Sequence, residues 1–198
     1  MENIKDKEFI RDYIKNLCIY KPSEPYMYGK MVGTRYNRQY YLANGTYNVE
    51  FLNCVCRQFY KIIDEEVGHF NFQITGREWA ALPLLSVIPL WLYNEKNIRI
   101  NSFMIKRERK TYGRNNYIEG LVNKLPVLII DDICNSTNGF LHCYNVITKT
   151  EKLESLPYIF AILNKYTTDI SVNSFVEDRY LKRGIKPLSI VNGNDMIW

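Results

Sequence analysis

Two adjacent carboxylates, Asp131 and Asp132, directly follow a run of four aliphatic residues from Val127 to Ile130. A continuous apolar run is typical of a buried strand, whereas acids need hydrogen-bond partners or solvent, so we expect the pair where the strand ends. Paired carboxylates in such a place can accept hydrogen bonds from vicinal hydroxyl groups or coordinate magnesium through oxygen. The alternative is that the two acids only cap the element that follows.

A small polar loop, residues 135–139, comes next and precedes a helix predicted over residues 139–150. Backbone N–H groups at the start of a helix can hold a phosphate, so the acids and the loop together could bind a ribose phosphate from two sides. The alternative is a set of ordinary turn-forming residues. The loop consists of Asn135, Ser136, Thr137, Asn138 and Gly139.

A basic segment lies earlier in the chain and has the sequence FMIKRERKTYGRNNYIEG over residues 103–120. Five basic side chains fall between Lys106 and Arg114 without an apolar period, and this pattern is typical of a mobile loop. Taken alone, such a run is most simply a solvated charge cluster or a nucleic-acid patch.

A third polar segment places Gly76, Arg77 and Glu78 between a predicted strand and a helix that begins near Pro83. An arginine in this position could bind phosphate oxygens through two parallel hydrogen bonds. An ordinary strand-to-helix turn with proline in the first helical turn explains the segment equally well.

Strands and helices alternate along most of the chain. Helices are predicted over residues 3–18, 49–67, 82–96 and 139–150, and strands over 70–75, 99–105, 126–130 and 158–164. The alternation predicts an α/β domain with a mostly parallel sheet that is covered on both faces, in which ligands bind beyond the carboxyl ends of the strands. The last segment, residues 181–198, could either complete the sheet or cover a dimer surface.

The composition narrows the class of protein. The 198 residues are 46% hydrophobic, enough for one ordinary globular domain, and the net charge of +5 suits an anionic small molecule as readily as nucleic acid. Five cysteines without CxxC spacing and only two histidines argue against a zinc site and favour reduced thiols in a cytoplasmic protein. The longest apolar stretch, Trp79 to Tyr93, is interrupted by prolines and shorter than the roughly 20 residues of a bilayer span.

The polar segments occur in an order that resembles the type I phosphoribosyltransferases, and most of all the orotate phosphoribosyltransferases. The acid pair and its loop are similar to the phosphoribosyl-pyrophosphate signature of that family, although Thr137 stands where glycine is usual. Residues 103–120 resemble the flexible catalytic loop of the orotate enzymes. The matching residues there are Lys106, Arg107, Glu108, Lys110, Tyr112, Gly113, Glu119 and Gly120.

The resemblance implies a type I phosphoribosyltransferase fold: a central, mostly parallel sheet flanked by helices. A small N-terminal hood, residues 1–48, would cover the base, and a core over residues 49–198 would carry the mobile loop, 106–118. The implied reaction moves the 5-phosphoribosyl group from phosphoribosyl pyrophosphate to a nitrogenous base, most of all orotate in pyrimidine nucleotide biosynthesis, with Mg²⁺ accompanying the pyrophosphate. It also implies a cytoplasmic homodimer whose loop acts across subunits, without membrane or nucleic-acid partners.

Two alternatives share this fold. The chain could use a different base, or it could be a non-catalytic regulator that binds phosphoribosyl pyrophosphate or a nucleotide. The presence of Lys110 within the basic loop favours an enzyme, since a protein that only binds its ligand has little use for it.

The resemblance also implies a role for each candidate residue. Lys110 and Asp132 are the catalytic candidates. Ribose and phosphate contacts are Asp131, Asp132, Asn135, Ser136, Thr137, Asn138 and Gly139, with Asp131 also a candidate magnesium ligand. Pyrophosphate contacts are Arg77, Glu78, Lys106, Arg107, Lys110 and Tyr112. Base contacts are Lys30, Arg35 and Tyr40.

Overall fold

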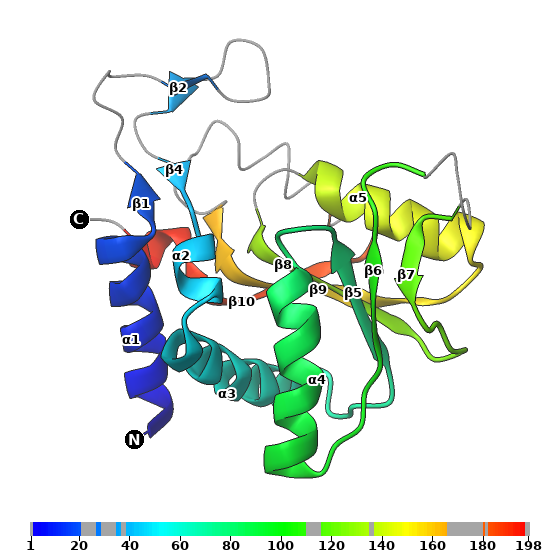
Figure 1. Cartoon of the computed structure of the whole chain (residues 1–198), viewed down its shortest axis with the longest axis horizontal. Helices are drawn as coiled ribbons and strands as arrows, with labels where there is room; N and C mark the ends of the chain where they lie inside the picture. Colours follow the sequence, from blue (N-terminus) through cyan, green and yellow to red (C-terminus); the bar gives the residue numbers. More distant parts are fainter. Residues whose placement is uncertain are drawn as a thin grey trace.

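A six-stranded sheet organises the chain (Figure 1). The computed structural model describes residues 2–20, 27–28, 35–36, 39–109, 116–134, 137–165, 180 and 182–196. The strands of the sheet are β5 (Gln73–Arg77), β6 (Ser102–Ile105), β7 (Ile118–Gly120), β8 (Val127–Cys134), β9 (Ser155–Asn164) and β10 (Lys186–Asn192). Their order is β10-β9-β8-β5-β6-β7, and every neighbouring pair is parallel except β6 with β7. The predicted α/β fold with a mostly parallel sheet is confirmed.

Helices cover both faces of this sheet (Figure 1). One face packs against α1 (Glu2–Leu17), α3 (Val49–Glu66) and α4 (Leu82–Lys96), and the other against α5 (Thr137–Asn145), which continues as a π-helix, Val146–Thr150. The smaller elements are β1 (Ile19–Tyr20), β2 (Met27–Tyr28), β3 (Arg35–Tyr36), β4 (Gln39–Tyr40), α2 (Ala43–Thr46) and a 3₁₀ turn, Gly193–Met196. No helix among the described residues is long and apolar enough to cross a membrane.

Alternation along the strands assigns side chains to the two faces. In β8, Leu128 and Ile130 belong to the core shared with α3 and α4, whereas Val127 and Ile129 belong to the core beneath α5. The same period continues into the acids, so Asp131 projects on the α5 face of the sheet.

The C-terminal segment completes the sheet. β10 lies parallel to β9 along its whole length, from Lys186 opposite Tyr158 to Asn192 opposite Asn164. Of the two possibilities for this segment, the described residues 182–196 therefore support the first.

The strand that carries the acids is longer than predicted. β8 was expected to end before Asp131, but it continues to Cys134 because β9 extends alongside it and pairs Asp131 with Ala161 and Cys134 with Asn164. The acids therefore lie within the strand, near its carboxyl end, and the partner strand keeps their backbone in the sheet.

Candidate functional site

The strand order of the sheet reverses between the neighbouring strands β5 and β8. From β5 the chain proceeds through α4 to β6 on one side, and from β8 it proceeds through α5 to β9 on the other. Backbone pairing between the two strands ends at Thr75 opposite Ile129, and the next residue of β5, Gly76, packs against the β8 backbone at the carbonyl of Ile130. In open α/β sheets this kind of reversal forms a crevice in which ligands bind. The acid pair and Arg77 lie on its two sides.

The two acids are half-buried and hold their backbone neighbours. The N–H of Asp132 donates to Oδ1 of Asp131 at 3.0 Å, and the N–H of Ile133 donates to Oδ1 of Asp132 at 2.7 Å. Burial, and after it the neighbouring Asp132 charge, raise the pKa of Asp131 to about 8, while the Arg77 guanidinium opposes the shift. Burial also raises the pKa of Asp132, against the hydrogen bond from Ile133. Near neutral pH the pair therefore does not carry two full charges, and it can both donate and accept hydrogen bonds.

Arg77 ends β5 on the opposite side of the crevice. Its guanidinium atoms lie 3.6–3.7 Å from the point where a Cβ on Gly139 would stand, which places the group against the first turn of α5. The side chain is half-buried, and no hydrogen bond or ion pair holds it among the described residues. Arg77 therefore brings a cation, with its donors available, to the same side of the sheet as Asp131.

The turn after Arg77 is constrained by close packing. A Cβ on Gly76 would lie 2.5 Å from the carbonyl oxygen of Ile130 and 2.3 Å from the Cβ of Ala81, so only glycine fits there. Glu78 is half-buried and its N–H donates to the carbonyl of Ile105. Trp79, which follows, has a positive φ of 69° and is 77% exposed.

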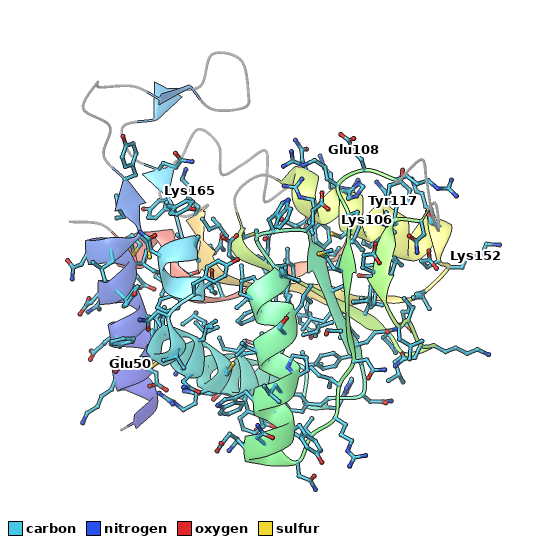
Figure 2. All side chains as sticks on the ribbon, viewed as in Figure 1. Glu50, Lys106, Glu108, Tyr117, Lys152 and Lys165 are labelled. Carbon is cyan, nitrogen blue, oxygen red and sulfur yellow. The ribbon has the colours of Figure 1, made fainter. Side chains whose placement is uncertain are left out.

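Lys106 lies at the base of the predicted mobile loop, and its side chain is only 5% exposed (Figure 2). Its Nζ donates to Oδ1 of Asn116 at 2.9 Å and to Oε1 of Glu119 at 3.1 Å, and its N–H donates to the carbonyl of Tyr117. The ammonium is therefore already paired with an acid. These contacts join the two described ends of the segment, residues 106–109 and 116–118.

His142 of α5 contacts both ends of the predicted mobile loop, at Lys106 and Tyr117. Its Nε2 lies 2.8 Å from the carbonyl oxygen of Lys106, and its ring meets Tyr117 edge to face at 5.7 Å. Sequence analysis missed both His142 and Asn116. A single histidine within a predicted helix carries no signal of this role; only its place three residues after the polar loop connects the two segments.

The remaining predicted residues are described to different degrees. Arg107 is exposed in the segment after β6, Asn138 is exposed and Gly139 buried in α5, and Tyr40 is half-buried in β4 with the Lys165 ammonium 5.7 Å from its ring centre. Arg35 in β3 and Thr137 at the start of α5 are placed by their backbone alone. Five predicted residues lie outside the described residues: Lys30, Lys110, Tyr112, Asn135 and Ser136.

Comparison with known proteins gives a consistent set of relatives. No protein-family model matches the chain. A curated orotate phosphoribosyltransferase from Methanosphaera stadtmanae is 31% identical over 100 residues, which are 50% of this chain and 51% of the relative. The chain thus matches about half the length of that protein.

Solved structures match almost the whole chain. A phosphoribosyltransferase from Corynebacterium diphtheriae superposes with a TM-score of 0.73 at 14% identity, covering 97% of this chain and 98% of that one. Orotate phosphoribosyltransferase from Mycobacterium tuberculosis, in complex with 5-phospho-alpha-D-ribosyl 1-diphosphate, superposes with a TM-score of 0.67 at 13% identity, covering 98% and 92%. The chain therefore has the type I phosphoribosyltransferase fold.

Proposed function

We propose that the chain is an orotate phosphoribosyltransferase, which moves the 5-phosphoribosyl group of phosphoribosyl pyrophosphate to a ring nitrogen of orotate and releases pyrophosphate. The observation that carries the proposal is the pair Asp131 and Asp132, half-buried near the carboxyl end of β8, with Asp131 on the same face of the sheet as Arg77. The orotate phosphoribosyltransferases from Methanosphaera stadtmanae and Mycobacterium tuberculosis, which the chain resembles, support the same assignment.

The acids would orient the sugar. As the bond from the anomeric carbon to pyrophosphate breaks, its electron pair leaves with pyrophosphate and the carbon gains oxocarbenium character. Hydrogen bonds from the ribose hydroxyls to Asp131 and Asp132 would hold the ring, and the negative charge that the pair carries would stabilise the cation that develops at the anomeric carbon. Burial raises the pKa of the Cys134 and Cys143 thiols to about 12, so neither supplies a thiolate, and the reaction requires no protein nucleophile.

The leaving group would meet the basic segments. In the proposal Lys110 offsets the charge that develops on pyrophosphate, and Arg107 and Tyr112 contact the leaving group. Glu78 would border the same site from the end of β5. Lys106 has a different setting, since its ammonium is buried against Glu119. We therefore propose that Lys106 organises the base of the loop while the exposed cations meet the ligand.

Magnesium belongs to the same proposal. Among the described residues no three His, Cys, Asp or Glu side chains form a cage for a metal ion. The donor set that is present, two neighbouring carboxylates, fits Mg²⁺, which is commonly held by one or two carboxylates together with substrate phosphates. Asp131 would be the carboxylate ligand, and the bound ion would neutralise the charge on pyrophosphate.

The proposal extends to the surroundings of the site. Residues 1–48 would form the hood over the base, with Lys30, Arg35 and Tyr40 as its contacts. The protein would act as a homodimer in which the loop reaches the neighbouring subunit. All five cysteines are buried and free, as is usual for proteins of the reducing cytoplasm, where we place it.

The test is an assay of pyrophosphate release with purified protein, phosphoribosyl pyrophosphate, Mg²⁺ and orotate. We expect release with orotate and a loss of roughly tenfold to a hundredfold in kcat/KM for Asp132→Asn, since a hydrogen bond to a charged group contributes about 1.5–3 kcal/mol. The exposed Asp64 of α3 provides the matched control, Asp64→Asn.

Three results would be informative in different ways. Release only with another base would correct the substrate. Tight binding of phosphoribosyl pyrophosphate without release for any base would contradict the enzyme and support a regulator. Absence of binding would contradict the proposal as a whole.

A further inference from the structure

The side chain of Arg77 leaves the sheet on the α5 face. Ile74 of the same strand belongs to the core beneath α3 and α4, and the two-residue period of a strand puts Arg77 on the opposite face. Asp131 projects on that face as well, from the strand across the crevice. Arg77 and Asp131 therefore lie on the same face of the sheet, the face that α5 covers.

The backbone of Arg77 has little freedom to change this direction. It pairs with Ile105 in the sheet, the next residue donates its N–H to the carbonyl of Ile105 at 2.9 Å, and the preceding Gly76 packs against Ile130 and Ala81. The sheet thus fixes the backbone position of Arg77, and packing against Gly139 fixes the position of its guanidinium group.

Among the residues that the structure describes, two positive groups meet at this point without an anion that pairs with them. The first turn of a helix carries unpaired N–H groups and the positive end of the helix dipole, and the Arg77 guanidinium lies against that turn at Gly139. Asp131 projects on the same face, but it forms no hydrogen bond or ion pair with Arg77 among the described residues. A half-buried arginine without a hydrogen bond or ion pair among the described residues leaves its donors available to a ligand.

We propose that Arg77 binds the 5-phosphate of the phosphoribosyl group, at the start of α5, and does not serve as a pyrophosphate contact. A phosphate monoester is the matching ligand, because its oxygens accept the paired N–H groups of a guanidinium in a bidentate manner. Asp131, on the same face, would then accept hydrogen bonds from the ribose hydroxyls of the same ligand. The inference rests on the proposed function and assigns Arg77 to the part of the substrate that is retained in the product.

The test is calorimetric titration of the full chain with ribose 5-phosphate, inorganic phosphate and pyrophosphate, each alone. For Arg77→Gln we expect a loss of about tenfold to a hundredfold in affinity for ribose 5-phosphate, as for a lost charge-assisted pair, and a change below about threefold for pyrophosphate. Arg77→Lys should bind ribose 5-phosphate with an affinity between those of the wild type and Arg77→Gln, since lysine keeps the charge but cannot donate two parallel hydrogen bonds. Arg99→Gln is the matched control, because Arg99 precedes the amino end of β6, with its guanidinium over the Tyr93 ring, whereas Arg77 is at the carboxyl end of the parallel strand β5.

The outcomes separate this inference from the proposed function. If Arg77→Gln lowers pyrophosphate affinity as much as ribose 5-phosphate affinity, or more, the inference is wrong and the pyrophosphate assignment returns. The inference is equally overturned if Arg77→Gln and Arg77→Lys, with unfolding transitions like that of the wild type, bind ribose 5-phosphate as tightly as Arg99→Gln does. An equal loss for inorganic phosphate and ribose 5-phosphate would locate the contact on the phosphoryl group, as we expect. A wild-type protein that releases pyrophosphate from phosphoribosyl pyrophosphate keeps the proposed function in either case.

Discussion

Lys106 and Glu119 form an ion pair of 3.1 Å across the base of the basic segment, with the lysine side chain 5% exposed and the glutamate 47% exposed. The pair joins the end of β6 to β7, where Met104 is opposite Glu119 in the antiparallel register. A buried ammonium is costly unless it is paired, so this contact fixes Lys106 in place before any ligand is bound.

We predict that Glu119→Gln lowers the free energy of unfolding by about 1 kcal/mol, since it removes a charged partner from a buried lysine that still keeps Asn116. Urea denaturation measures the change. Glu65→Gln is the control, because Glu65 forms an exposed i,i+4 pair with Lys61 at 3.8 Å, for which we expect no measurable effect. Equal effects in the two variants would show that burial of Lys106 adds nothing to the pair.

We predict that Lys106→Met reduces stability while changing pyrophosphate affinity little, because the ammonium is engaged within the protein. Thermal unfolding and calorimetric titration with pyrophosphate give the two readouts on one sample. A stable variant with greatly weakened pyrophosphate binding would restore Lys106 as a direct ligand contact.

We predict that His142→Phe lowers the free energy of unfolding by about 1 kcal/mol, the typical contribution of a hydrogen bond, because the Lys106 carbonyl loses its partner while the ring contact with Tyr117 can be kept. Chemical denaturation followed by fluorescence is suitable. His69→Phe is the comparison, since His69 accepts only a longer, exposed hydrogen bond from Asn71 at 3.2 Å. His142 is unimportant to the loop base if both variants behave alike.

We predict that the contribution of Asp131 to the free energy of unfolding falls as pH rises from about 4 to about 8. Its pKa is raised in the folded protein from 3.8 to about 8, so the folded state keeps a proton that the unfolded state has released in this window. That contribution is complete below the unfolded pKa and is lost as pH rises through the folded one. Asp131→Asn should remove this slope and be more stable than the wild type near pH 8. Urea unfolding at several pH values tests it; an unchanged slope in Asp131→Asn would assign the dependence elsewhere.

We predict that Gly76→Ala destabilises the protein by about 1–3 kcal/mol, the usual cost of overpacking, because its methyl group would lie 2.5 Å from the Ile130 carbonyl oxygen. Gly139→Ala is the contrasting variant: its methyl group would meet Arg77 at an ordinary 3.6 Å, and alanine favours the helix by up to about 1 kcal/mol. Differential scanning calorimetry compares them. Similar stability in both would mean that the backbone between β5 and β8 relaxes freely.

The sequence by itself determined the class of fold and the segments that carry the chemistry. The continuous apolar runs around Ile129 and Phe160 predicted buried parallel strands, and the helix predicted over residues 82–96 coincides with α4. These features depend on local periodicity, on proline in the first helical turn and on apolar composition, all of which are legible within one segment. The acid pair was recognisable for the same reason, since adjacent carboxylates conflict with the apolar run before them.

Only the tertiary structure decided how the predicted residues relate to one another. The strand containing Asp131 extends to Cys134 because its partner β9 does, and local sequence holds no information about a partner some 30 residues away. Lys106 is a buried member of an ion pair, whereas Arg77 lies against α5 and has no ion pair within the described part of the chain, although both are basic residues at strand ends. Side-chain burial, charge pairing and pKa depend on distances between separate segments, and these distances exist only once the sheet, the crevice between β5 and β8, and α5 have packed together.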